Sequence, residues 1–314
     1  MPDWVTHLGT TYIAAGSAGK LNPRWNQFLE IRHFLLGALL PDATRFTVIL
    51  VDVLDWPAIP TFTYLIPFHS LLIVGLMSGA IALLFPASNG SSLRAFGLIM
   101  MGAALHFLLD DLEGKVGCGS TTFYPIYFGK PVAGWDSEGN FAVALLVVSA
   151  IAIGVALGRK AQSPPVTVQF TKKRWAAAGL LLAAALVVPL FFRQWMIDRN
   201  AYYLGFVTNP VAFAGQMVEL CYSEVVATQP VTIEEFDTPF LLETLPTLAA
   251  GEWVSVRGVY QNGVIQPETL VQHRGFSDVS LSLIAAVAFI FLVIDKQFIF
   301  WSIKWITTPK NSVD

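Results

Sequence analysis

Charged residues are scarce in this sequence. Asp, Glu, Lys and Arg make up 13% of the 314 residues, whereas ordinary soluble domains contain about 25%. The formal net charge is −3, so no strongly basic balance predicts a nucleic acid as a partner. Hydrophobic residues reach 54%, and a large share of the surface must therefore avoid water. We expect an integral protein of the cell membrane, with the lipid bilayer as its partner.

Cysteine is nearly absent as well. Cys118 and Cys221 are the only two, which is too few for a disulfide framework or a thiolate metal site. They could form one bridge, but we expect them to be unpaired.

Residues 1–20 lack the basic start and the uninterrupted apolar core of a signal peptide. We therefore expect this segment to belong to the mature protein.

Long apolar runs are what the sequence does contain. A helix needs about 20 mostly apolar residues to cross a membrane, and five segments qualify: 62–85, 93–112, 141–158, 175–192 and 279–301. Between residues 33 and 54, two shorter apolar arms flank Pro41, which would interrupt a continuous helix. The sequence predicts an all-α polytopic membrane protein with about five transmembrane helices, N-terminal re-entrant or interfacial helices, and a small external β-containing domain.

Basic residues set the expected orientation. The connection between the third and fourth apolar segments contains no acidic residue and five basic ones: Arg159, Lys160, Lys172, Lys173 and Arg174. The positive-inside rule places this connection in the cytoplasm, together with the C-terminal tail, which carries Lys304 and Lys310. Residues 194–278 are then external.

The external segment carries a β pattern. Its polar and apolar residues alternate from Trp253 to Gly258, and Asn262-Gly263 is a strong signal for a hairpin turn. We expect a small β-domain that caps the membrane part. A ligand-binding barrel of the OB type is the alternative, ranked lower because the surroundings are acidic. His273, beside Arg274, is interpreted as part of a solvated loop.

Two of the five histidines, His69 and His106, lie inside predicted membrane helices. An ionisable group at mid-bilayer costs at least about 2.5 kcal/mol, so it usually has a partner or a function. His106 and Asp110 are four residues apart and share a helix face. This spacing suits a metal site, although it also suits a hydrogen bond. The first two apolar segments are antiparallel neighbours, which places His69 at the same depth, near the outer face.

Other candidate ligands are less specific. Asp42 follows Pro41 and could reach a metal from a re-entrant turn, or could cap a helix. His7 is the weakest candidate on physical grounds and could be an interfacial residue. Asp111 is either a second acid near the metal or the solvated end of its helix. His33, beside Arg32, is expected to face the cytosol or the headgroups.

Five short motifs within about residues 1–130 resemble those of bacterial membrane-bound metal-dependent hydrolases, and more distantly are similar to zinc-dependent phospholipase C. They are D-x-x-T-H ending at His7, GALLPD ending at Asp42, F-H-S around His69, G-x-x-x-H-x-x-x-D ending at Asp110, and YPIYF. The resemblance implies that Asp42, His69, His106 and Asp110 hold one divalent metal, expected to be zinc. It also implies that His7 shares Asp110 to hold a second.

The sequence departs from this family at two places. Ala43-Thr44 stands where a second acid is usual, and Ile66-Pro67-Phe68 stands where a His-Arg pair often precedes the H-S motif.

A bound Zn²⁺ lowers the pKa of its water to about 7, and Asp110 or Asp111 would orient the attacking water. We expect a metal-dependent hydrolase of a phosphoester or phospholipid-like substrate at the outer membrane face.

Two other functions remain open from the sequence. One is a non-catalytic polytopic membrane protein with a partner-binding external domain, whose His and Asp residues form packing hydrogen bonds. The other is a metal or proton transporter, which is disfavoured because segments 141–158 and 175–192 contain almost no polar residue. The expected division of the chain is a metal-site region 1–158, a basic loop and span 159–193, an external domain 194–278, and a last span with its tail 279–314.

Overall fold

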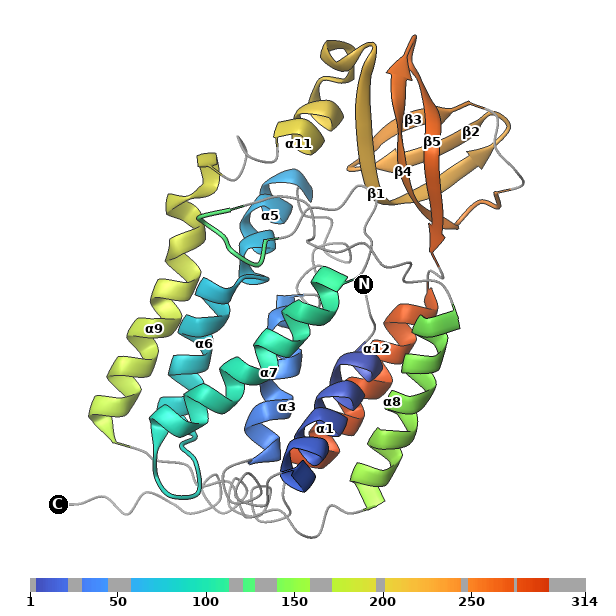
Figure 1. Ribbon diagram of the computed structural model, residues 1–314. Helices are drawn as coiled ribbons and strands as arrows, with labels where there is room; N and C mark the ends of the chain where they lie inside the picture. Colours follow the sequence, from blue (N-terminus) through green and yellow to red (C-terminus); the bar gives the residue numbers. More distant parts are fainter. Residues whose placement is uncertain are drawn as a thin grey trace, which may run out of the picture.

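The structure is a computed structural model that shows a helical bundle with a small β-barrel at one end (Figure 1). It describes nine stretches of the chain: residues 4–21, 30–44, 58–112, 121–127, 140–158, 171–195, 201–243, 248–273 and 276–293. The second apolar arm of the 33–54 region, residues 46–54, lies outside these stretches. The C-terminal tail, with Lys304 and Lys310, does so too.

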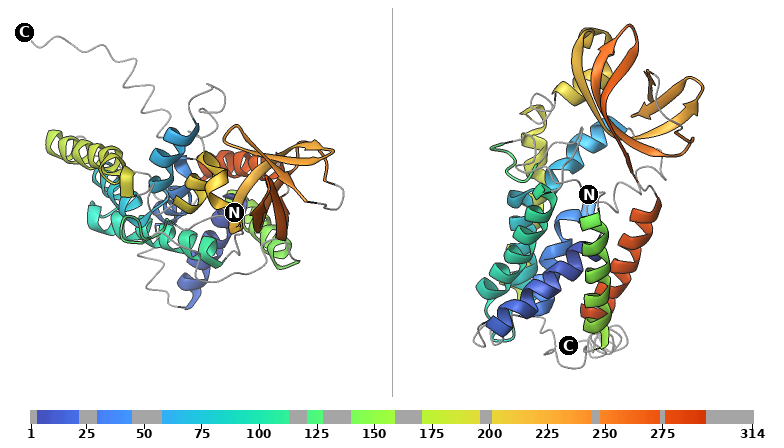
Figure 2. Two further views of the ribbon diagram at one scale, coloured as in Figure 1. Left: turned by 90° about the horizontal axis from the view of Figure 1, so that it is seen from above. Right: turned by 45° about the vertical axis from the view of Figure 1, so that its right-hand side comes forward.

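The bundle consists of two packed groups of helices. Helices α1 (Trp4–Leu21), α8 (Asn140–Gly158) and α12 (Phe276–Val293) pack together. Helices α3 (Ile31–Leu39), α7 (Ser92–Leu112), α6 (Leu71–Leu84) and α9 (Lys172–Phe191) form the second group, and α3 also contacts α1. Figure 2 shows the two groups from two further directions. The first group and α3 bury an apolar cluster that includes Leu8, Leu35 and Ile153, and the second group buries one that includes Val74, Ile99 and Phe107.

Glycines allow the closest helix contacts. A Cβ atom on Gly102 of α7 would overlap the carbonyl oxygen of Phe34 on α3, and a Cβ on Gly37 of α3 would overlap that of Ile99. The two backbones therefore touch where these glycines face each other. Small residues serve the same purpose in membrane helix pairs, because they let backbones approach closely.

The expectation of five transmembrane helices is wrong. Within the described stretches, two helices are long and apolar enough to cross a membrane, Ser92–Asp111 and Lys172–Phe191. Other apolar helical stretches are shorter: Leu71–Leu84, Ala144–Leu157 and Ser280–Ile290. At a rise of 1.5 Å per residue, a helix of 14 residues covers only about 21 Å of a hydrocarbon core that is about 30 Å thick.

The first predicted span, 62–85, is interrupted. It divides into α5 (Ala58–Leu65), a short 3₁₀ helix η2 (Ile66–Phe68) and α6. Ser70 begins α6 as its N-cap, because its hydroxyl accepts a hydrogen bond from the Ile73 amide and donates one to the Pro67 carbonyl. This local capping replaces a continuous helix, and it leaves His69 in the break.

The segment that the sequence predicted to be external forms a closed five-stranded barrel. Its strands are β1 (Gln216–Thr228), β2 (Val231–Glu235), β3 (Thr238–Leu242), β4 (Trp253–Gln261) and β5 (Val264–His273), in the order β1-β2-β3-β5-β4. The β3–β5 pair is parallel and the other pairs are antiparallel. This arrangement is that of an OB-type barrel. The all-α class is thus corrected, because a complete β-barrel is part of the fold.

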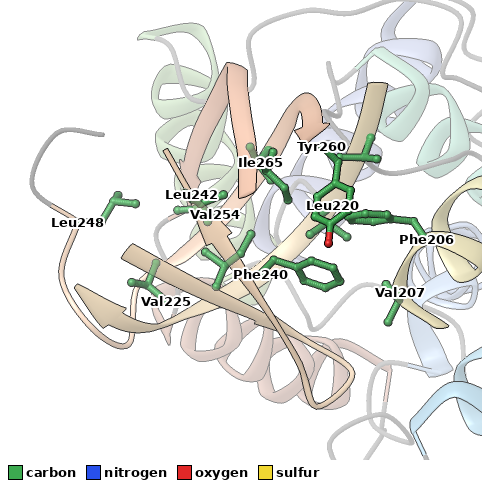
Figure 3. Close-up of a cluster of buried hydrophobic side chains, with 13 residues drawn as sticks. Phe206, Val207, Leu220, Val225, Phe240, Leu242, Leu248, Val254, Tyr260 and Ile265 are labelled. Carbon is green, nitrogen blue, oxygen red and sulfur yellow. The ribbon is translucent and has the colours of Figure 1, made fainter. Parts of the chain in front are cut away.

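The barrel has its own core. Leu220, Val254 and Ile265 project inward from three strands, and Phe206 of the preceding helix α11 (Ala201–Thr208) stacks on Phe240 (Figure 3). A short 3₁₀ helix, η4 (Pro210–Phe213), joins α11 to β1. The predicted hairpin is present, because Gln261 pairs with Val264 across Asn262 and Gly263, which have φ values of 55° and 84°.

Cys221 on β1 is disulfide-bonded. The expectation that the cysteines are unpaired is therefore wrong. Disulfides persist mainly in oxidising compartments such as the bacterial periplasm, so this bond bears on which side of the membrane the barrel occupies.

Candidate metal centre

Helix α7 supplies two residues of the candidate centre. His106 and Asp110 lie in its last two turns, on one face, and are 0% and 2% exposed. The Nε2 atom of His106 lies 3.5 Å from Oδ2 of Asp110. Figure 1 shows that this end of α7 is the one nearer the barrel. The i, i+4 spacing therefore places an imidazole and a carboxylate at one depth.

Asp42 and His69 enter from breaks in the helical structure. Asp42 is buried in the 3₁₀ turn η1 (Pro41–Thr44), which directly follows α3. His69 follows η2 and precedes the N-cap of α6. Both residues reach the face of α7 that carries His106 and Asp110, because donor atoms of each lie within 3.7 Å of donor atoms on that face.

The donor atoms of these four residues converge. The Nε2 atom of His69 lies 3.1 Å from Nε2 of His106 and 3.0 Å from Oδ2 of Asp110. The Oδ1 atom of Asp42 lies 3.5 Å from Nε2 of His69 and 3.7 Å from Nε2 of His106. Five donor-to-donor distances thus fall between 3.0 and 3.7 Å, including the His106–Asp110 distance.

His7 joins the same cluster from helix α1. Its side chain is fully buried, and its Nε2 atom lies 3.3 Å from Oδ1 of Asp110. Its ring stacks on that of His106, with centroids 3.9 Å apart. Asp110 therefore turns one carboxylate oxygen toward His7 and the other toward His69 and His106. Helix α1 did not follow from the sequence, because Thr, Gly and His interrupt its apolar residues.

Hydrogen bonds outside the cluster orient its members. The Nδ1 atom of His106 lies 2.7 Å from the carbonyl oxygen of Ala38. Because a carbonyl only accepts, Nδ1 carries the proton and Nε2 of the neutral ring presents a lone pair to the cluster. Trp4 Nε1 donates to Oδ2 of Asp42 at 2.9 Å, which leaves Oδ1 for the histidines. Thr121 donates to the carbonyl of His69.

Sequence reasoning missed these orienting residues. Trp4 was one of nine tryptophans, and Ala38 acts only through its backbone. The signal that could have found Ala38 is the pair of glycines, Gly37 and Gly102, since facing small residues indicate a close helix contact. Trp4 precedes His7 by three residues, so the two share a face of an α-helix.

Three other residues discussed from the sequence, of which only Asp111 was a candidate for the site, lie outside the cluster. Asp111 is partly buried on α7 and is rotated by about 100° from Asp110 around the helix axis. His33 is buried, contrary to expectation, with Nε2 2.9 Å from the Phe85 carbonyl oxygen and Nδ1 3.2 Å from a Glu30 oxygen. His273 ends β5 and stacks on Tyr222, and burial lowers its pKa to about 4.

The helices also present many apolar side chains outward. On α9, for example, Leu180, Leu190 and Phe191 are 72%, 59% and 80% exposed. Exposed apolar surfaces of this kind mark contact with a membrane or with another protein. The fold and the cluster together define a helical membrane protein that carries a buried histidine–aspartate centre and a barrel domain.

The comparison with protein families agrees. A family model described as "YdjM inner membrane protein" matches residues 1–196. This match covers more than half of the chain, and the chain therefore belongs to the YdjM inner membrane protein family. No curated protein matches the chain, and no solved structure does.

The matched family corrects the resemblance drawn from the short motifs. The family that matches is the YdjM family, and no finding points to zinc-dependent phospholipase C. Motifs of three to nine residues, rich in Gly, Leu and Phe, are easily shared by unrelated membrane helices. The membrane localisation stands, because the family is one of inner membrane proteins.

Proposed function

We propose that Asp42, His69, His106 and Asp110 bind a divalent metal ion, with His7 beside them. The observation that carries this proposal is the set of five distances between donor atoms, 3.0–3.7 Å. Zinc bound tetrahedrally at about 2.0–2.2 Å holds its ligands about 3.3–3.6 Å apart. Imidazole nitrogens and carboxylate oxygens are also common zinc ligands.

Charge supports the same proposal. Asp42 and Asp110 bring two carboxylates into a cluster in which both are 2% exposed. Buried charges are costly unless they are paired or coordinate a metal. A divalent cation balances two carboxylates, and neutral histidines can complete its ligand set. The orienting bonds from Ala38 and Trp4 are of the kind that fix metal ligands in place.

The proposed activity is hydrolysis of a phosphoester, such as that of a phospholipid, at the outer face of the membrane. A divalent metal bound here would supply a Lewis acid for a phosphoryl oxygen. Asp110, whose two carboxylate oxygens face His7 and His69, would orient the attacking water. The barrel-facing position of the centre and the family's membrane location favour a lipid over a soluble substrate.

The proposed orientation is multi-pass, with the barrel and the metal centre outside and the C-terminus in the cytoplasm. Two independent observations support it. Lys172, Lys173 and Arg174 begin α9 at its end remote from the barrel (Figure 1), where the positive-inside rule expects cytoplasm. Cys221 of the barrel is disulfide-bonded, which fits an oxidising compartment.

Hydrolysis of labelled phospholipid in detergent micelles tests the activity. We expect the purified chain to release product, to stop when a chelator is added, and to recover when Zn²⁺ is restored. His69→Ala should abolish product release, because it removes a donor from the cluster. His273→Ala is the matched control, since that histidine lies in the barrel. Equal rates in the two variants, or a rate that ignores the chelator, would exclude this function.

A further inference from the structure

A short segment after α7 is attached to the break that carries His69. The Thr121 hydroxyl donates to the His69 carbonyl at 2.6 Å, and the Leu71 amide donates to the Thr122 carbonyl at 3.0 Å. These bonds hold residues 121–127 against the start of α6. The segment is therefore fixed beside the cluster at its barrel-facing end, where Figure 1 shows it in green near α6 and α9.

This segment turns most of its large apolar side chains outward. Phe123, Ile126 and Tyr127 are 51%, 89% and 51% exposed, whereas Tyr124 between them is 2% exposed. Exposed apolar groups of this size, gathered within five residues, are unfavourable in water. We refer to Phe123, Ile126 and Tyr127 as the apolar lip.

The buried tyrosine sets the depth of the lip. Tyr124 packs edge-on against Phe192 and Trp195, with ring centroids 6.0 and 5.5 Å apart. Phe192 directly follows α9, a helix able to span the membrane that ends at Phe191, and Trp195 comes three residues after Phe192. Trp and Tyr are enriched at the membrane–water interface. The lip therefore lies at the level of the lipid headgroups, and exposed Arg193 adds a cation there.

The lip is also next to the accessible side of the cluster. The His69 side chain is 17% exposed, whereas those of His7, His106, Asp42 and Asp110 are 0–3% exposed. A substrate can thus reach the cluster past His69, and His69 is the cluster residue that the segment touches.

We propose that the apolar lip inserts into the outer headgroup region and receives the acyl chains of a phospholipid whose phosphate reaches the cluster past His69. The delivery of a phospholipid to the cluster rests on the proposed hydrolase function. The insertion of the lip into the membrane rests only on the exposure of its side chains and on its depth next to the end of α9. Arg193 supplies the positive charge that an anionic headgroup needs.

Insertion is measured without any assay of activity. The chain carrying Ile126→Cys is labelled with an environment-sensitive fluorophore and reconstituted in vesicles of phosphatidylethanolamine and phosphatidylglycerol. We expect blue-shifted emission that is quenched by a lipid with a spin label near the headgroup. The matched control is Glu268→Cys, an exposed position on β5 of the barrel, which should be quenched by iodide in water. Iodide quenching at both positions would overturn the inference.

Substrate delivery is measured by comparing two substrates. In the triple variant Phe123→Ser, Ile126→Ser and Tyr127→Ser, we expect kcat/KM on vesicle phospholipid to fall about tenfold or more, because apolar contact with the bilayer is lost. Hydrolysis of a soluble aryl phosphodiester and the zinc content should stay unchanged.

The control for substrate delivery is a triple variant of exposed apolar residues away from the lip, Val211→Ser, Val226→Ser and Leu241→Ser. Equal losses on vesicles in both variants would contradict the delivery role. If the unmodified chain hydrolyses neither substrate, the proposed function fails, and the fluorescence result still decides insertion.

Discussion

The state of a single histidine ring determines what the cluster can bind. The Ala38 carbonyl fixes the proton of His106 on Nδ1, and Nε2 therefore presents a lone pair toward His69 at 3.1 Å. If His69 also presents a lone pair, the two repel unless a cation lies between them. If instead His69 donates a proton, the pair is a neutral hydrogen bond. Metal binding is the arrangement that also balances both carboxylates.

Gly102 positions His106 through the hydrogen bond between His106 Nδ1 and the Ala38 carbonyl. Replacement of Gly102 is therefore predicted to weaken metal binding. Gly102→Ala puts a Cβ into the Phe34 carbonyl, which pushes α3, and with it Ala38, away from His106. Overpacking of this kind costs about 1–3 kcal/mol, and loss of an orienting bond typically lowers metal affinity about 10–100-fold. Thermal unfolding in detergent and a chelator competition measure the two effects.

Gly97 provides the matched control on the same helix. A Cβ at Gly97 meets nothing within 4 Å, so Gly97→Ala should keep full metal affinity and gain up to about 1 kcal/mol of helix stability. If Gly102→Ala is as stable as Gly97→Ala and binds metal equally well, the close contact between α3 and α7 does not position His106.

At the level of residues, sequence reasoning placed part of the cluster. It put His106, Asp110 and His69 at one depth, because i, i+4 spacing and a short connection between antiparallel segments are local features. Asp42 remained ambiguous, since a residue after Pro41 suits a cap as well as a ligand. His7 was proposed as a metal ligand only through the family resemblance. Its contact with Asp110 depends on how α1 packs against α7, and residue spacing in the sequence does not reveal that packing.

At the level of elements, hydropathy located the helices but not their lengths. The apolar run 62–85 is broken because Pro67 and Ser70 favour a local cap over a continuous helix. A hydropathy window averages over such a break. The strands β4 and β5 were predictable from alternation and from the Asn-Gly turn. Closure of the barrel was not, because the parallel β3–β5 pairing joins residues that no local pattern links.

Helix α9 makes the proposed orientation testable. Its basic start, at Lys172, should lie in the cytoplasm and the barrel outside. In intact spheroplasts, a membrane-impermeant maleimide should label Glu268→Cys, which is exposed on β5 of the barrel. It should label Lys172→Cys, also exposed, only after permeabilisation. The reverse pattern would invert the orientation and move the metal centre to the cytoplasmic face.

At the level of the whole molecule, the cluster lies toward the end of the bundle that is nearer the barrel. His106 and Asp110 lie in the last two turns of α7, and Phe68, just before His69, packs with Ala185 and Val188 near the end of α9. Figures 1 and 2 show that these ends of α7 and α9 are the ones nearer the barrel. A buried polar centre near the headgroups can exchange ions and substrate with the aqueous side, whereas one at mid-bilayer cannot do so without a channel. This placement is one reason for proposing a lipid headgroup as the substrate.

Zinc K-edge X-ray absorption of the purified chain tests the metal centre most directly. We predict about one zinc ion per chain, surrounded by nitrogen and oxygen atoms at about 2.0–2.2 Å. The signal should vanish in the double variant His106→Ala and Asp110→Ala, and it should persist in His273→Ala with Glu224→Ala. A chain that contains no metal after growth with zinc, or zinc that survives the loss of His106 and Asp110, would contradict the account.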